Sequence, residues 1–76
     1  MSTVTLNTLP RGGSAVVSSL TTSGAMRRRL MDIGLTPGTR VQALFHSCSG
    51  DPTAYLIRGA VIALRSEDAQ TILVQI

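Results

Sequence analysis

The chain of 76 residues predicts one small domain, residues 1–76, with no room for a cofactor domain beside a structural core. Its hydrophobic content of 43% excludes wholesale disorder, and its longest clear apolar run, Ala60–Leu64, is far too short to span a bilayer. The net charge of +3 comes from seven arginines and no lysine, which favours partners that carry carboxylates or phosphates.

The compartment follows from the N-terminal residues and the cysteine count. Residues 1–7 contain neither a basic segment nor a long apolar one, so we expect no signal peptide. The single cysteine, Cys48, cannot form an internal disulfide, which fits a reducing compartment. We therefore expect a cytoplasmic protein that does not insert directly into a membrane.

Glycine and proline recur at short intervals, and short apolar segments lie between them. This rhythm predicts a small, mainly-β barrel with one inserted helix. The first strand is predicted at residues 15–20. Before it, Leu6 and Leu9 are expected to form a turn that packs over one open end of the barrel.

The inserted α-helix is predicted over about residues 24–33. Met26, Leu30 and Ile33 fall at i, i+4 and i+7 and form one apolar stripe. A side chain at residue 22 or 23 is expected to cap the first turn by accepting a backbone N–H. Gly34 is expected to end the helix, because glycine adopts a positive φ at little cost.

Four further strands are predicted after the helix, at residues 40–46, 54–58, 61–65 and 71–76, which makes five in all. A type II turn at 36–39 leads into the first of them. Gly59 and Ala60 are expected to form the II′ turn of a hairpin. Ser66 is expected to cap a short helical turn at about residues 66–70.

The arginine run within the helix is the most distinctive local feature. Each helical residue advances by about 100°, so Arg28 points away from the apolar stripe while Arg27 and Arg29 flank it. This pattern fits a solvated face, a partner-docking face or a nucleic-acid face. Nucleic acid fits least, because single-strand binders stack bases on aromatic side chains. The chain has only Phe45 and Tyr55, and Phe45 is expected in the core.

His46 and Cys48 are two residues apart, so on a strand they would face the same way. Both residue types bind metals, and Asp51 could add an oxygen ligand. A closed structural site needs four ligands, however, and the chain has one histidine and one cysteine. His46 and Cys48 are therefore only weak candidates for metal ligands.

Other candidate chemistry is sparse. The segment Gly50, Asp51, Pro52 is expected to form a turn in which the aspartate side chain caps its own loop. The chain contains no glycine-rich phosphate loop, and no catalytic triad or carboxylate pair at a credible spacing. We expect a protein that is not an enzyme and that holds no cofactor.

The order and spacing of these motifs resemble the FeoA family. Residues 27–41 run from an arginine-rich helix through a glycine turn into a Pro-Gly turn, as FeoA proteins do. The resemblance extends from about residue 6 to residue 76. It continues at residues 50–52, 58–59, 63–65, 67–69 and 72–74. It implies a small five-stranded SH3-like barrel with one inserted helix.

The resemblance also implies a function. FeoA-like proteins are cytoplasmic accessory proteins of bacterial ferrous iron uptake and act on FeoB, a membrane iron transporter with its own GTP-binding domain. We expect partner binding at Arg27, Arg28, Arg29, Gly50, Asp51 and Pro52. Two alternatives stay open. One is a small metal-binding carrier. The other is a stand-alone SH3-like regulatory or nucleic-acid-binding module, because a similar module lies at the C-terminus of metal-dependent transcriptional regulators.

Overall fold

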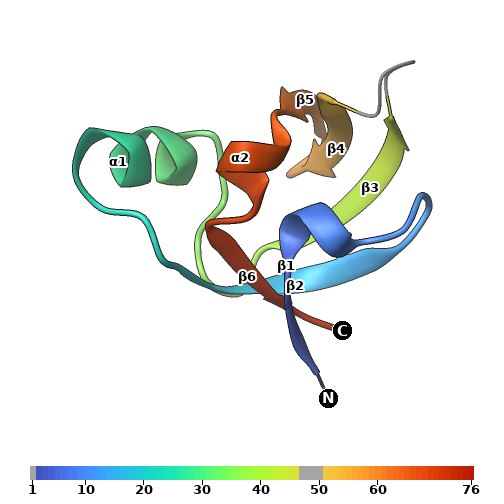
Figure 1. The fold of residues 1–76 in the computed structure, drawn as a ribbon, viewed down its shortest axis with the longest axis horizontal. Coiled ribbons are helices and arrows are strands. Elements are labelled where there is room, and N and C mark those ends of the chain that lie inside the picture. The colour runs from blue at the N-terminus through green and yellow to red at the C-terminus, as the bar shows by residue number, and fades with distance from the viewer. Residues whose placement is uncertain (1, 47–50) are drawn as a thin grey trace.

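The computed structural model describes residues 2–46 and 51–76. Antiparallel strands form one sheet in the order β1-β6-β2-β3-β4-β5, which curls into an SH3-like barrel (Figure 1). In chain order the elements are β1 (Thr3–Thr5), the 3-10 helix η1 (Leu6–Thr8), β2 (Ser14–Leu20), α1 (Gly24–Asp32), β3 (Arg40–His46), β4 (Thr53–Ile57), β5 (Ala60–Leu64), α2 (Ser66–Ala69) and β6 (Ile72–Gln75).

The mainly-β class and the order of the elements are confirmed, but the described residues contain six strands where the sequence predicted five. The additional strand is β1, which pairs with β6 through Val4 opposite Val74. It is three residues long, too short to show the alternation that marks a strand in a sequence. Its β-branched residues adopt the extended conformation of a strand because they can pair with the edge of β6 that β2 does not occupy.

The core lies inside the curled sheet and receives alternate side chains from the strands. Tyr55 on β4 is 2% exposed and is the largest buried side chain, and Ile57 two residues later is fully buried. Burial raises the pKa of Tyr55 above its ordinary value, although a hydrogen bond with the Thr53 side chain opposes the shift. Leu6 and Leu9 are buried around η1, as the sequence predicted.

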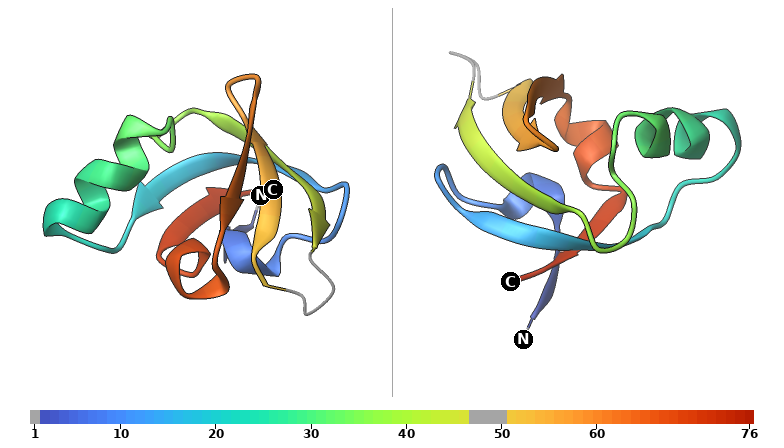
Figure 2. Two further views of the ribbon diagram at one scale, coloured as in Figure 1. Left: turned by 90° about the horizontal axis from the view of Figure 1, so that it is seen from above. Right: turned by 180° about the vertical axis from the view of Figure 1, so that it is seen from behind.

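Helix α1 projects beyond the barrel at one end of the molecule (Figure 2). Leu30 is buried, while Met26 and Ile33 are half-buried against the core, so the apolar stripe is confirmed. Gly34 follows with φ +110°. Its N–H donates to the Met31 carbonyl and the next N–H donates to the Leu30 carbonyl, which is a Schellman ending. The expected side-chain cap is absent: Ser23 occupies the N-cap position without such a bond.

The two turns differ in how well the sequence anticipated them. The Pro-Gly turn is confirmed, with Gly38 at φ +92° and the Thr39 N–H donating to the Thr36 carbonyl. The hairpin turn is not at Gly59-Ala60. Ile57 pairs with Ala60, so Arg58 and Gly59 form the turn, at φ +50° and +82°. Two positive φ angles define a type I′ turn, which matches the twist of the strands.

Phe45 is 53% exposed, so the expectation that it belongs to the core is wrong. The pairing of β3 with β4 shifts register between Ala43 and Phe45. An extra residue at such a bulge turns the following side chain to the other face of the sheet. Phe45 therefore lies opposite Ala54 on the outer face, while Ala43 remains in the core.

Candidate functional site

All three helix arginines are exposed, but they do not form one cluster. Arg27 and Arg28 line an open hollow on the outer side of α1, together with Met31 and Asp32. The Arg27 guanidinium donates to the Met31 sulfur, with Nη1 3.0 Å from Sδ. This contact lays the arginine stem along the helix and holds its charge at the surface.

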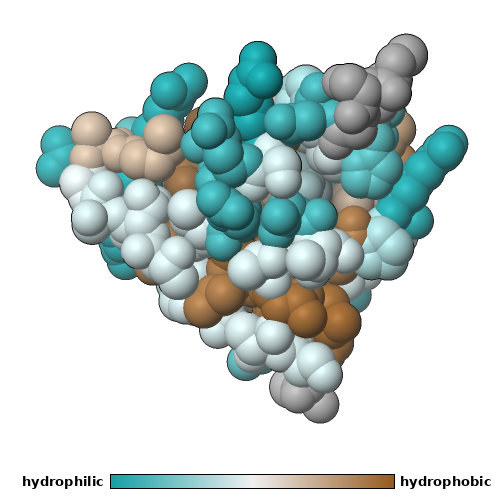
Figure 3. Space-filling view, viewed as in Figure 1, coloured by the Kyte–Doolittle hydropathy of each residue, from teal (hydrophilic) through white to brown (hydrophobic). Residues whose placement is uncertain are grey.

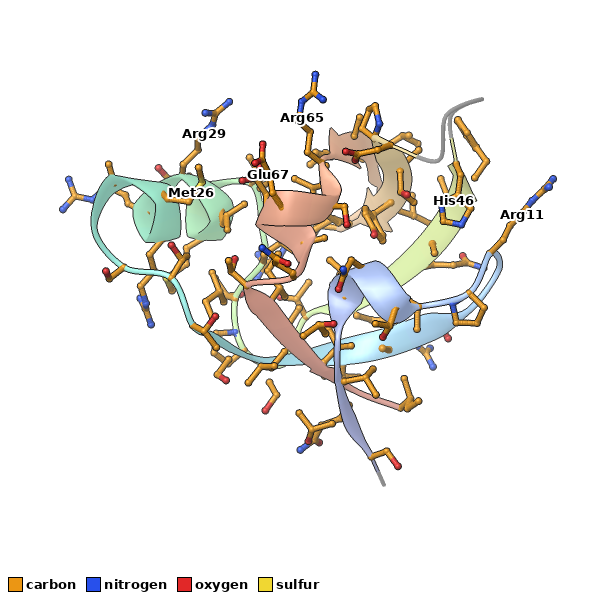
Figure 4. All side chains as sticks on the ribbon, in the orientation of Figure 1. Arg11, Met26, Arg29, His46, Arg65 and Glu67 are labelled. Atoms are coloured by element: carbon orange, nitrogen blue, oxygen red, sulfur yellow. The ribbon has the colours of Figure 1, made fainter. Side chains whose placement is uncertain are left out.

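Arg29 turns to the opposite side and borders a groove of about 400 Å³ between α1 and the β5–α2 segment. Apolar residues from α1 and β5 form much of the lining, and Arg29, Arg65 and Asp68 add charge. Figure 4 shows Arg29 and Arg65 projecting to the same side of the molecule, with Glu67 between them and Met26 beside Arg29 on α1. The apolar lining residues are Met26, Leu30, Ile33, Ile62, Ala63 and Leu64.

The predicted loop at 50–52 is only partly described, because Gly50 lies outside the described residues. Asp51 and Pro52 are half-buried. The Asp51 Oδ1 accepts the Ser66 N–H at 2.7 Å, across fifteen residues. Ser66 is the first residue of α2 and not its N-cap. Asp51 thus satisfies a donor of the first turn and fixes the loop to α2.

The two metal candidates have different outcomes. His46 is exposed at the end of β3, and its Nδ1 lies 2.7 Å from the Thr53 hydroxyl. Cys48 lies outside the described residues. In residues 2–46 and 51–76, no group of three or more His, Cys, Asp or Glu side chains is arranged to hold a metal ion. Figure 4 shows His46 at the far end of the molecule from Arg29.

Sequence reasoning missed a pair of arginines on the outer face of the sheet. Arg40 and Arg58 line one hollow, although eighteen positions separate them in the chain. Val41 pairs with Ile57 in the antiparallel sheet. Arg40, which precedes Val41, therefore comes opposite Arg58, which follows Ile57. The predicted strands contain both arginines, but their proximity becomes evident only when β3 is paired with β4 in the correct register.

The surface around these sites is unevenly polar. Hydrophilic residues cover α2 in Figure 3, whereas a hydrophobic patch lies lower, over the strands near the chain termini. Exposed large apolar residues include Val16, Val61 and Ile76. Among the described helices, none is both long enough and apolar enough to cross a membrane.

Several solved structures are similar to this chain. The FeoA protein of Chlorobium tepidum is 36% identical, covering 96% of this chain and 70% of that one, with a TM-score of 0.89. The FeoA-like protein of Clostridium acetobutylicum is 29% identical and covers 100% and 88%, with a TM-score of 0.91. Stenotrophomonas maltophilia FeoA, complexed with zinc, is 30% identical and covers 95% and 89%, with a TM-score of 0.85.

The similarity of this chain to regulatory proteins concerns the fold alone. IdeR of T. acidophilum is 22% identical, with a TM-score of 0.84, and only 35% of that protein is covered. A search of curated proteins found no match. The FeoA domain family, in contrast, matches residues 4–76, nearly the whole chain. Together with the SH3-like barrel, this match shows that the chain belongs to the FeoA family.

Proposed function

We propose that this protein is a non-enzymatic, cytoplasmic accessory protein of bacterial ferrous iron uptake. It acts by binding the cytoplasmic portion of a FeoB-type membrane transporter. The family match over residues 4–76 is the observation that carries the proposal. The zinc-complexed Stenotrophomonas relative supports it, because that protein is described as a candidate activating factor for ferrous iron transport. A small barrel with exposed arginines suits binding better than chemistry.

The docking surface that we propose comprises the arginines of α1 and the loop at residues 50–52. Helix α2 lies between them. Arg29 and Arg65 border the groove shared by α1 and the β5–α2 segment, and Asp51 binds the first N–H of α2. A partner that covered α1 and α2 would therefore contact both regions. Charged groups at such a surface act mainly on encounter rate and specificity.

Arg28→Glu tests this surface. Arg28 is exposed and points away from the buried stripe, so the change removes little packing. The new carboxylate faces Asp32 at i, i+4, a repulsion of only about 0.2–0.5 kcal/mol. We expect association with the transporter's cytoplasmic portion to weaken by about tenfold at low salt and to recover largely at high salt, because an exposed charge is screened. Titration calorimetry at two ionic strengths measures both effects.

Arg11→Glu is the matched control for Arg28→Glu. It makes the same change of charge at an exposed position, at the far end of the molecule from α1 (Figure 4). A thermal melt of each variant separates loss of fold from loss of contact. Equal binding by the two folded variants would contradict docking through α1 and would move the site to the loop at residues 50–52.

A metal carrier is the second candidate, because the Stenotrophomonas relative was crystallised with zinc. In this chain the Nδ1 of His46 already lies within hydrogen-bond distance of the Thr53 hydroxyl. His46 therefore offers one ring nitrogen, Nε2, to a metal. We expect weak binding of Fe(II) or Zn(II) by the purified protein, measured by competition with a chromophoric chelator. Stoichiometric, sub-micromolar binding that His46→Ala abolishes would favour the carrier instead.

A further inference from the structure

The outer face of β2, β3 and β4 contains a hollow of about 490 Å³. One cross-strand row on this face runs from Ser14 through Gln42 and Leu56 to Val61. The next row places Val16 beside Arg40. The hollow thus combines polar, apolar and cationic side chains from neighbouring strands. Its lining residues are Ser14, Arg40, Val41, Gln42, Leu56, Arg58 and Gly59.

Arg58 is held in place at the rim of this hollow. Its Nη2 donates to the hydroxyls of Thr36 and Thr39, at 3.1 and 3.4 Å. Its stem lies against Gly34, where an added Cβ would be 3.1 Å from the arginine Cδ. Both hydrogen bonds use one terminal nitrogen, so three N–H donors are not used by them. Because the side chain is already ordered, less entropy is lost when a ligand binds.

The charge in this hollow is uncompensated among its lining residues. Among the described residues that line it, Arg40 and Arg58 are cationic and none is acidic. Two other arginine-lined hollows differ: Asp32 lies with Arg27 and Arg28, and Asp68 lies with Arg29 and Arg65. Two like charges on one face repel each other, and an anion that lies between them offsets this repulsion. The hollow is therefore complementary to carboxylates, which bind guanidinium groups through paired hydrogen bonds.

Apolar side chains flank the arginine pair and narrow the choice of ligand. Leu56 is half-buried, and Val16 and Val61 are 39% and 61% exposed. A small inorganic ion would contact the guanidinium groups alone. A peptide segment with acidic and apolar side chains would cover the arginines and also bury this apolar area, which adds favourable free energy.

We propose that the hollow between Arg40 and Arg58 is a docking site for an acidic, partly apolar segment of a protein partner. Its carboxylates would bind the two guanidinium groups, and its apolar side chains would pack over Leu56 and Val61. The inference rests on the proposed function, because it takes the cytoplasmic portion of the transporter as the protein that carries the segment. It adds a second contact, separate from α1.

A titration followed by NMR of the 15N-labelled protein tests the site without the transporter. The probe is the hexapeptide Glu-Val-Glu-Val-Glu-Val, and the control is the same peptide with glutamine in place of glutamate. We expect saturable shifts of the amides of Arg40, Gln42, Arg58 and Gly59 with the acidic peptide only. Inorganic phosphate at equal ionic strength distinguishes a small anion: equal affinity for phosphate would overturn the proposal.

Arg40→Gln and its control Arg11→Gln complete the test. Both remove one exposed positive charge, but only the first lies in the hollow. We expect Arg40→Gln to bind the acidic peptide and the transporter's cytoplasmic portion about tenfold more weakly, while Arg11→Gln binds as the wild type does. If the two variants bind alike, the inference is wrong and the proposed function stands. Failure of the wild-type protein to bind the transporter would contradict the proposed function itself.

Discussion

Tyr55→Ala is expected to remove most of the free energy of unfolding and to leave a substantial unfolded fraction at physiological temperature. Tyr55 is 2% exposed and is the largest side chain in the core. Truncation of a buried aromatic residue to alanine costs about 3–5 kcal/mol, because the cavity is only partly refilled. A domain this small has a total stability on the order of 5 kcal/mol. Far-UV circular dichroism during heating should show a transition that begins at a much lower temperature than in the wild type.

Tyr55→Phe is the control for Tyr55→Ala. It keeps the ring in the core and removes only the hydroxyl, which forms a hydrogen bond with the Thr53 side chain. We expect a loss of about 1 kcal/mol, which lowers the Tm of a domain of this size by about 4–8 °C. If Tyr55→Ala melts cooperatively at the same temperature as Tyr55→Phe, the ring does not hold the core together.

Gly34→Ala is expected to lower the free energy of unfolding by about 2–3 kcal/mol. Gly34 adopts φ +110°, which strains any L side chain. An added Cβ would also lie 3.1 Å from both Ile57 Cγ2 and Arg58 Cδ. The change disrupts the junction that orients α1, so partner binding should weaken with stability. A urea titration and a thermal melt measure the loss, which corresponds to a fall in Tm of about 10–20 °C.

Gly38→Ala separates the two causes in Gly34→Ala. Gly38 has φ +92°, but an added Cβ would meet no atom within 4 Å. It therefore introduces the backbone strain without the clash, and we expect a loss of about 1 kcal/mol. Equal losses at the two glycines would show that the contacts of Gly34 with Ile57 and Arg58 are unimportant.

The sequence predicted those parts of the fold that depend on local patterns. The spacing of Met26, Leu30 and Ile33 located α1, and Gly34 marked its end. Features that depend on distant pairing were missed. Strand β1 forms because β6 lies beside it, and Phe45 turns outward because of a bulge against β4. Neither contact leaves a signal within a few residues of the chain.

The same distinction applies to the candidate site. A run of adjacent arginines, Arg27 to Arg29, is evident in the sequence, although the structure divides it between two sides of α1. Arg40 and Arg58 come together only through strand register. The role of Asp51 at α2 likewise joins segments fifteen residues apart. Such arrangements require the three-dimensional structure.

The most direct test of the proposed function is the affinity of the purified protein for the isolated cytoplasmic portion of its FeoB-type transporter. Measured by calorimetry at low and physiological salt, binding should be saturable and should weaken as salt rises, because the exposed surfaces of the protein are rich in arginine. Folded wild-type protein that shows no saturable binding at either salt concentration would contradict the account.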